Sequence, residues 1–190
     1  MKAGRLRRMM DKIINFQFSI QYMPGKKYIL SKEAAAKKLR RIALQVVENN
    51  YDEPELILVG IRENGIVIAN EIANYLQDVF SGTVTVIELG MNKKKPVDII
   101  LSKTIDFNGK IILLIDDVAN SGSTMLYALK PFLETYPKKI QTIALVERTH
   151  KFFPIDVDYV GLSISTTTDE HIYVEVENNQ VQGAWIEIKE

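Results

Sequence analysis

The sequence predicts an α/β fold in which helices flank a mainly parallel central sheet and a small β-hairpin follows at the C-terminal end. Apolar runs alternate with amphipathic segments along most of the chain, as they do where crossover connections join parallel strands. The run Ile111–Ile115 contains no polar residue, which is typical of a strand covered on both faces. Two further strand-like segments meet at Asn178-Asn179, a pair that favours a hairpin turn.

The predicted elements follow an N-terminal extension. We expect residues 1–27 to form this extension, which carries the turn signal Pro24-Gly25 and is interpreted as an arm that packs on a partner subunit. A single domain is expected to occupy residues 28–190. The central strands are predicted at Leu56–Ile61, Thr83–Leu89, Ile111–Ile115, Ile140–Val146 and Val157–Leu162, and the hairpin strands at Ile172–Val176 and Val181–Ile188.

Three amphipathic helices are expected between the strands. Ser31 is a suitable N-cap for the first helix, and Ser123-Thr124 opens the third. Pro131 is expected to kink or shorten the third helix, because proline removes a backbone donor. The polar stretch Gly90–Ile105 is predicted to be a lid or a disordered segment, because long connections inside compact domains usually are. The predicted apolar stripes are Ala35, Leu39, Ile42, Ala43 and Val46 in the first helix, Ala69, Ile72, Ala73 and Leu76 in the second, and Met125, Leu129, Phe132 and Leu133 in the third.

The composition is that of an ordinary globular domain, with 46% apolar and 25% charged residues among 190. The 24 basic and 24 acidic residues leave a net charge of zero, so there is no bulk attraction to nucleic acid or to an anionic membrane. The chain has no cysteine, which excludes disulfides and thiolate metal sites. The sequence has neither an apolar run of membrane-spanning length nor an evident signal peptide, and we expect a cytoplasmic protein without a membrane partner.

The most informative stretch is Ile111–Thr124. Its apolar strand is followed by two carboxylates, Asp116 and Asp117, then by the small-residue loop Val118–Gly122, and then by the hydroxyl-bearing start of a helix. A strand, a Ser/Gly loop and a helix N-terminus together favour phosphate binding. Carboxylates beside a phosphate indicate sugar hydroxyls or a divalent cation in the ligand. A ribose 5-phosphate with Mg²⁺ meets these conditions, and the alternative is a buried strand that runs into a polar turn.

This stretch resembles the phosphoribosyl-pyrophosphate (PRPP) signature of the type I phosphoribosyltransferases, in which apolar residues, an acidic pair and a Thr/Ser-Gly-x-Thr loop follow one another. Residues 121–124 match that loop. The resemblance implies the type I phosphoribosyltransferase fold, with the hairpin as a hood. It also implies that Asp116 and Asp117 hold the ribose hydroxyls and, indirectly through ribose or water, the cofactor Mg²⁺. The residues implied in binding PRPP, and its 5′-phosphate in particular, are Ala119, Asn120, Ser121, Gly122, Ser123 and Thr124.

The residues Arg62, Glu63, Asn64 and Gly65 lie between the first core strand and the next helix, where this family has its pyrophosphate loop. The resemblance implies that Arg62 and nearby backbone amides meet the pyrophosphate, and that Arg62 and the acidic pair form the catalytic set. Members of the family often hold a strained, sometimes cis, non-proline peptide here, and Gly65 gives the backbone room. Glu63 adds a negative charge that either weakens pyrophosphate binding or is offset by Mg²⁺. The alternative is an ordinary strand-to-helix turn.

Three segments resemble one branch of the family, the pyrimidine-operon attenuators that double as uracil phosphoribosyltransferases. These segments are Tyr28–Asn49, Leu58–Gly65 and Leu145–Gly161. The chain departs from this branch at Gly90-Met91, where the relatives carry a Tyr-Arg pair in the flexible loop that closes over PRPP. Lys93–Lys95 are candidates to supply the missing charge.

The acceptor is expected to be a pyrimidine base, uracil in particular. The purine-salvage branch has an aspartate at the position of Asn120 and a base-recognising lysine at that of Asp156. An amide cannot act as a general base, and a carboxylate accepts where a lysine donates. Asp156 and Val160 are weak candidates for base contacts, and Asp156 is equally well interpreted as a solvated loop residue.

Two classes of function are compatible with these features. The first is an enzyme that transfers 5-phosphoribosyl from PRPP to a nucleobase and releases pyrophosphate, expected as a homo-oligomer such as a dimer. The second is a regulator, either an RNA-binding attenuator or a protein that binds PRPP or nucleotides without turnover. RNA would be held by basic residues at its phosphates, although a basic helix face is more often a solvated surface. The candidate residues are Lys37, Arg40, Arg41, Arg148 and Lys151.

Overall fold

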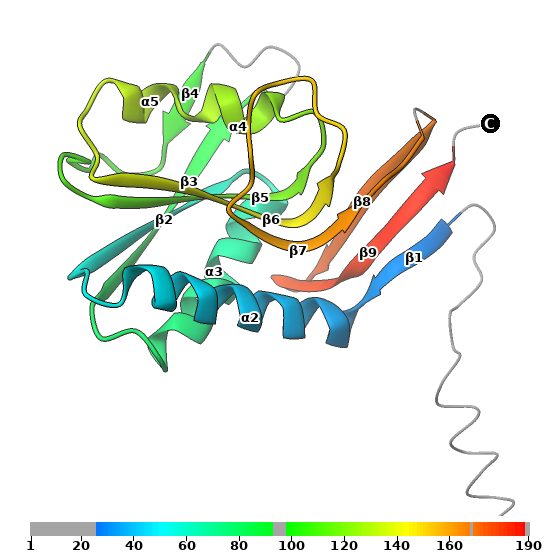
Figure 1. Ribbon diagram of the computed structural model, residues 1–190, viewed down its shortest axis with the longest axis horizontal. Helices are drawn as coiled ribbons and strands as arrows, with labels where there is room; N and C mark the ends of the chain where they lie inside the picture. Colours follow the sequence, from blue (N-terminus) through cyan, green and yellow to red (C-terminus); the bar gives the residue numbers. More distant parts are fainter. Residues whose placement is uncertain (1–25, 93–97, 168, 189–190) are drawn as a thin grey trace, which may run out of the picture.

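A six-stranded sheet forms the centre of the computed structural model, which describes residues 26–92, 98–167 and 169–188. Its strands are β2 (Glu55–Ile61), β3 (Thr83–Met91), β4 (Ile99–Leu101), β5 (Ile111–Ala119), β6 (Lys139–Arg148) and β7 (Tyr159–Ile164). They lie in the order β4-β3-β2-β5-β6-β7 (Figure 1). Neighbouring strands are parallel from β3 to β7, and β4 runs antiparallel to β3 at one edge. The predicted mainly parallel α/β sheet is therefore confirmed.

Two pairs of helices cover the faces of this sheet (Figure 1). The bounds are Lys32–Asn50 for α2 and Asn64–Gln77 for α3, which pack on one face, and Ser123–Ala128 for α4 and Lys130–Leu133 for α5, which lie over the other. Ser31 is the predicted N-cap of α2, and its Oγ accepts a hydrogen bond of 3.2 Å from the Ala34 N–H. The apolar stripes predicted for α2 and α3 are buried. Among the described residues, no helix is long and apolar enough to span a membrane.

The central strand β5 contributes to the core on both sides of the sheet. Ile111, Leu113 and Ile115 pack with α2 and α3, whereas Ile112 and Leu114 pack with α4 and α5. Because successive side chains of a strand point to opposite faces, a strand that is covered on both faces needs an unbroken apolar run. This explains the pattern from which the strand was predicted.

Pro131 interrupts the third predicted helix, as expected. The first part ends at Ala128 and the second begins at Lys130, with the proline in its first turn. Phe132 is fully buried, whereas Leu133 is 73% exposed. The assignment of Leu133 to the apolar stripe is therefore wrong, because the break in the helix moves this residue out of register with the preceding turns.

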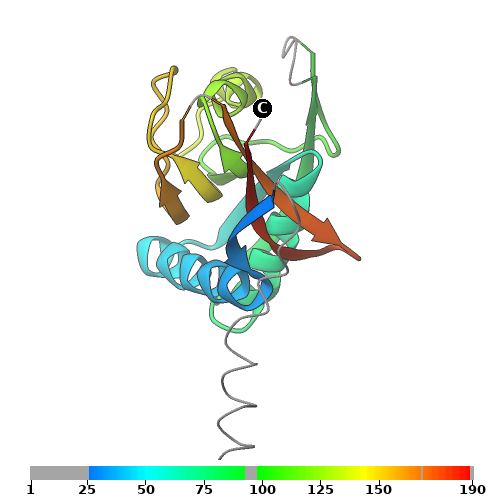
Figure 2. The same cartoon turned by 90° about the vertical axis from the view of Figure 1, so that its right-hand side faces the viewer.

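A second, three-stranded sheet forms a hood beside the carboxyl end of β5. The predicted hairpin is present as β8 (Glu170–Glu177) and β9 (Gln180–Ile188). Asn178 and Asn179 connect them with positive φ values of 51° and 57°, as in a type I′ turn. β1 (Lys26–Ser31) pairs antiparallel with β9 and completes the order β1-β9-β8, which lies in front of the central sheet in Figure 2.

The strand β1 is absent from the sequence-based prediction. It begins at Lys26, so its first two residues belong to the stretch that was expected to be the extension. Lys26 and Tyr28 pair with Glu187 and Trp185 of β9. The turn signal Pro24-Gly25 and the expected arm lie outside the described residues.

The stretch predicted to be a lid is partly a β-hairpin. β3 continues through Gly90 to Met91, and Ile99–Leu101 returns beside it as β4. The continuation follows the alternation of Ile87, Leu89 and Met91, whose side chains pack in the core under α4. Lys93–Lys95 lie outside the described residues.

Candidate active site

The loop between β5 and α4 forms a small cup. β5 continues through both aspartates to Ala119, so the expected loop Val118–Gly122 is shorter than predicted and begins at Asn120. The cup encloses a cavity of about 30 Å³. Its lining residues are Asp116, Val118, Ala119, Asn120, Ser121, Gly122, Thr124 and Met125.

The backbone of this loop is held from both sides. Gly122 has a φ of 84°, a left-handed conformation that glycine adopts without strain. The Ser121 carbonyl accepts hydrogen bonds from the Phe152 and Phe153 N–H groups at 3.0 and 3.1 Å. Leu126 donates to the Gly122 carbonyl at 3.0 Å, which begins the hydrogen bonding of α4. The Ser123 N–H donates to Ser121 Oγ at 3.3 Å. The other N–H groups of the first turn have no acceptor within the helix, and such groups are suited to an anion.

The acidic pair lies at the end of β5, where Asp116 lines the cup and Asp117 does not. Asp116 is 2% exposed, whereas Asp117 is half-buried. Asp116 Oδ1 accepts the Asp117 N–H at 3.0 Å, and Asp117 Oδ1 accepts the Val118 N–H at 2.9 Å. Asn64 Nδ2 donates to Asp117 Oδ2 at 2.8 Å and to the Val174 carbonyl of β8 at 3.1 Å. The loop after β2, the acidic pair and the hood are therefore joined at one point.

The expected pyrophosphate loop packs tightly against β5. Its peptide bond Arg62–Glu63 is cis, a form that some members of the family are expected to have here. A Cβ atom at Gly65 would lie 2.6 Å from the Ile115 carbonyl oxygen, so only glycine allows α3 to start this close to the strand. The position therefore does give the backbone room, as predicted.

Arg62 has a partner that the sequence did not indicate. Its Nε forms an ion pair of 3.0 Å with Glu88 of β3, while its side chain is 66% exposed. The parallel register places Ile61 opposite Leu89, which brings Arg62 beside Glu88. The contact depends on the register of β2 and β3, which the sequence does not specify. The pair keeps the guanidinium near the carboxyl ends of β2 and β3 and adds another carboxylate there. We call the region beyond the carboxyl ends of the central strands, which includes the cup, the crevice.

Arg148 is a second residue whose role was not foreseen. It ends β6, and its Nη1 donates to Asn120 Oδ1 of the cup at 3.0 Å. The same guanidinium donates to Thr166 Oγ1, to the Thr167 carbonyl and to the Glu170 carbonyl, the last at 3.2 Å. Arg148 thus joins the cup to the residues that lead into the hood.

Three of the five candidate RNA-binding residues make side-chain contacts within the protein. Arg148 is engaged by the hood, Lys151 pairs with Glu147, and Arg41 donates to the Val160 and Gly161 carbonyls at 2.6 and 3.3 Å. Arg41 therefore connects α2 to β7 and is not simply a solvated residue of the basic face. Lys37 and Arg40, the remaining candidates, are exposed on α2.

The two weak candidates for base contacts have other contacts in the structure. The Asp156 carbonyl accepts the Thr142 hydroxyl at 3.0 Å, and Asp156 Oδ1 accepts the Val157 N–H at 3.2 Å. The Val160 side chain packs against the core under α4. Neither residue lines the cup, and their role in base binding stays a prediction.

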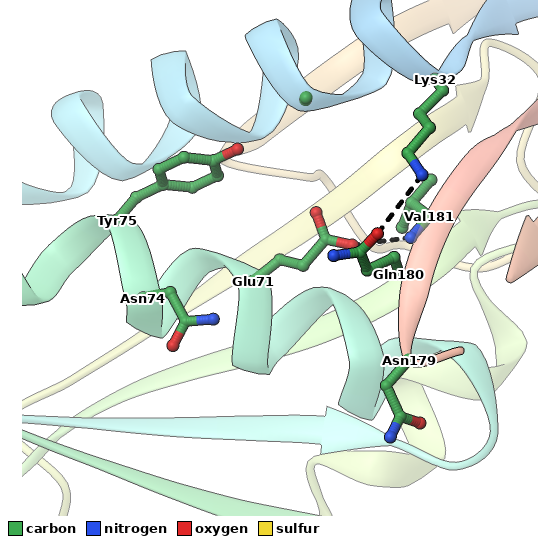
Figure 3. A pocket seen from close by; sticks show the side chains of 8 residues that line it. Lys32, Glu71, Asn74, Tyr75, Asn179, Gln180 and Val181 are labelled. Atoms are coloured by element: carbon green, nitrogen blue, oxygen red, sulfur yellow. Dashed lines mark hydrogen bonds between the residues drawn. The ribbon is translucent and has the colours of Figure 1, made fainter. Parts of the chain in front are cut away.

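A separate cavity of about 350 Å³ lies where α2 and α3 meet the turn of the hood (Figure 3). Glu71 of α3 reaches this turn, where its Oε1 accepts the Val181 N–H at 2.6 Å. Lys32 Nζ donates to Gln180 Oε1 at 3.3 Å. These contacts hold the β8–β9 turn against the helices and lie apart from the cup.

The fold and the crevice define the class of this protein. A mainly parallel sheet with a hood at its carboxyl edge, and an acidic pair ahead of a Ser/Gly loop, are the features of a phosphoribosyltransferase domain. Residues 26–179 match the family described as "Phosphoribosyl transferase domain". The chain belongs to this family.

The curated relatives of the chain include proteins named "Bifunctional protein PyrR". One from Pelotomaculum thermopropionicum is 33% identical over 162 residues, which cover 80% of this chain and 90% of that protein. One from Bacillus subtilis is 31% identical over 167 residues, which cover 82% of this chain and 92% of that protein. Both matches extend over most of the chain, in agreement with the resemblance seen in its segments.

Solved structures support the fold. A hypoxanthine-guanine phosphoribosyltransferase from Bacillus anthracis has a TM-score of 0.67 at 19% identity, covering 88% of this chain and all (100%) of that one. The hypoxanthine phosphoribosyltransferase of Trypanosoma cruzi has a TM-score of 0.70 at 15% identity, covering 86% of this chain and 97% of that one. The predicted type I phosphoribosyltransferase fold is thereby confirmed.

Proposed function

We propose that this protein transfers 5-phosphoribosyl from PRPP to a nucleobase, with uracil favoured, and releases pyrophosphate. The observation that carries the proposal is that Asp116 lines the cup and Asp117 follows it directly at the end of β5, in a chain of this family. The cup would take the 5′-phosphate at the backbone donors in the first turn of α4. Asp117, whose orientation is fixed by Asn64, would accept bonds from the ribose hydroxyls.

The remaining groups act on the leaving pyrophosphate. Arg62 lies at the same edge of the crevice and would stabilise the negative charge that develops as the C1–O bond breaks. To reach the pyrophosphate, its guanidinium must leave or share Glu88, which is 3.0 Å away. The hood and the hairpin of β3 and β4 would limit the access of water, which otherwise hydrolyses the activated sugar.

The donor set is suited to Mg²⁺. Aspartate oxygens are the hard ligands that this ion prefers, usually one or two from the protein together with phosphate oxygens. The described part of the chain contains no cluster of three or more His, Cys, Asp or Glu side chains able to hold a metal alone. Mg²⁺ would thus be held together with PRPP, near Asp116 and Asp117. When bound, it would neutralise part of the negative charge on the departing pyrophosphate.

The acceptor base follows from Asn120, because an amide cannot take a proton from a purine ring. Uracil is therefore the proposed acceptor, and the PyrR relatives share the proposed class. A reaction of this kind belongs to intracellular nucleotide metabolism, including pyrimidine salvage, so we place the protein in the cytoplasm. We also propose that it works as a homo-oligomer, with a dimer as the simplest form.

The test measures product formation from PRPP and Mg²⁺ with uracil, guanine or hypoxanthine as acceptor. We expect UMP, and we expect Asp117→Asn to lose PRPP affinity with a nearly unchanged melting temperature. GMP or IMP formed faster than UMP would contradict the choice of acceptor. Absence of all three products with intact PRPP binding would contradict turnover.

A second candidate function is a regulator that binds PRPP or a nucleotide without turnover, with or without RNA. The ion pair of Arg62 with Glu88 and the replacement of the Tyr-Arg pair by Gly90-Met91 favour it, because both weaken the pyrophosphate side of the site. RNA binding would rest on Lys37 and Arg40. Affinity for a pyrimidine-leader RNA should then fall by roughly 0.7–0.9 logarithmic units per phosphate contact for each tenfold rise in salt. Replacing Arg40 with Gln should reduce this slope.

A further inference from the structure

The side chain of Asn120 is held in one orientation by Arg148. A guanidinium carries only N–H donors and no acceptor, so the atom of the carboxamide that faces Arg148 Nη1 at 3.0 Å must be the oxygen. The amino group is then the part of the side chain left to the cup, which Asn120 lines.

Arg148 is itself fixed by contacts that do not involve the ligand. Its Nε and Nη2 donate to Thr166 Oγ1 and to the Thr167 and Glu170 carbonyls. These acceptors come from the chain that leads into β8 and from the first residue of that strand. A planar guanidinium that donates to several acceptors at once has little freedom to turn. The orientation of Asn120 is therefore set before any ligand binds.

We propose that Arg148 is a positioning residue that turns Asn120 into a hydrogen-bond donor toward an oxygen atom of the ligand. The inference rests on the proposed function and adds to it which atom of the loop recognises the ligand. The acceptor is an oxygen of the phosphate group or a carbonyl oxygen of the base. A site built in this way disfavours a ligand that presents an N–H to Asn120, because two donors would face each other.

The sharpest test uses aspartate, which has the shape of asparagine but presents only acceptors when ionised. Isothermal titration of UMP at pH 7.5 should show about fivefold weaker binding for Asn120→Ala, which merely loses a donor, and about thirtyfold or more for Asn120→Asp, which sets a carboxylate against an oxygen. Asn74→Asp is the matched control. It adds the same charge on an exposed part of α3 beside the separate cavity. The affinity of this control variant for UMP should stay within about twofold of that of the wild type.

Two further arms identify the oxygen and exclude a merely structural effect. If the acceptor is a phosphate oxygen, ribose 5-phosphate shows the same penalty as UMP for Asn120→Asp; if it is a base carbonyl, only UMP does. Either result supports the proposal. The loss of UMP affinity in Asn120→Asp, relative to the wild type, should become smaller as the pH is lowered toward 4, because a protonated aspartic acid can donate a hydrogen bond. Asn120→Asp binding within about twofold of the wild type would overturn the proposal.

A ligand-free measurement separates this inference from the proposed function. In a double-mutant cycle, Asn120→Ala should lower the urea midpoint of the wild type but not that of Arg148→Met, where the hydrogen bond no longer exists. Absence of coupling would overturn the orientation, even with intact UMP binding. Coupling without any binding of UMP or ribose 5-phosphate would overturn the proposed function and leave only the orientation.

Discussion

Replacing Asn64 by aspartate is the most informative single change at the site. Asn64 Nδ2 lies 2.8 Å from Asp117 Oδ2 and 3.1 Å from the Val174 carbonyl. Asparagine donates to both acceptors, whereas an ionised aspartate donates to neither. The Asn64→Asp variant therefore places two carboxylates in contact and leaves the carbonyl of β8 without its side-chain donor.

The size of the effect can be bracketed from this distance. Two like charges 2.8 Å apart repel by about 1.5 kcal/mol at a dielectric constant of ~80 and by about 6 kcal/mol at ~20. Asp117 is half-buried and the new side chain can rotate, so we expect about 3 kcal/mol of destabilisation at pH 7. Asn64→Ala loses the hydrogen bonds without adding charge and should lose about 1–2 kcal/mol.

The pH dependence separates repulsion from simple loss of contacts. In Asn64→Asp, the neighbouring carboxylate raises the pKa of one member of the pair above its unfolded value. The folded variant then binds the proton more tightly than the unfolded chain does, so the penalty is present at neutral pH and declines as the pH falls through the raised pKa. Urea unfolding at pH 7 and pH 5, with Asn64→Ala in parallel, measures this. An aspartate penalty that equals the alanine penalty at both pH values would refute the reasoning.

Three other changes test packing and burial in the fold. Gly65→Ala brings a Cβ to 2.6 Å from the Ile115 carbonyl and should destabilise by about 1–3 kcal/mol in urea, together with loss of PRPP affinity. Burial raises the pKa of Tyr159 above its ordinary value of 10.0, so this group stabilises the fold fully below that pH and less as the pH rises further. In Tyr159→Phe this loss is removed, so the free energy of unfolding should depend less on pH above about 10. Phe132→Ala removes a fully buried ring that meets Phe107 edge-on at 4.9 Å and should lose about 3–5 kcal/mol in thermal unfolding.

The features that sequence reasoning predicted are those encoded locally. The strand Ile111–Ile115 and the cap Ser31 follow from patterns within a few residues, and the turn at Asn178-Asn179 from the residue types that accept positive φ. The acidic pair and the loop after it lie in one continuous motif. These local features are present in the folded structure because the tertiary contacts favour the same conformation as the local sequence does.

The features that were missed depend on partners far away in the chain. β1 becomes a strand by pairing with β9 at the opposite end of the chain. The short sequence of β1 alone does not predict a strand. Arg62 meets Glu88 only through the register of β2 and β3. Arg148 looked like a surface cation in the sequence, yet its contacts reach residues 18–28 positions away. Side-chain pairing across strands cannot be predicted from spacing along one of them.

The hood is attached to the crevice at both sides, and this bears on either proposed function. On one side Asn64 connects Asp117 to the Val174 carbonyl; on the other, Arg148 connects Asn120 to the Glu170 carbonyl. Both carbonyls belong to β8. A ligand that binds Asp117 and Asn120 therefore contacts the hydrogen-bond partners of the two residues, Asn64 and Arg148, that hold this strand. In an enzyme, this coupling would order the hood when substrate is present; in a regulator, it would carry the occupancy of the site to the outer sheet. Because a ligand can shift the hood only by its differential affinity for the two states, loss of either attachment should weaken ligand binding and the ordering of β8 together.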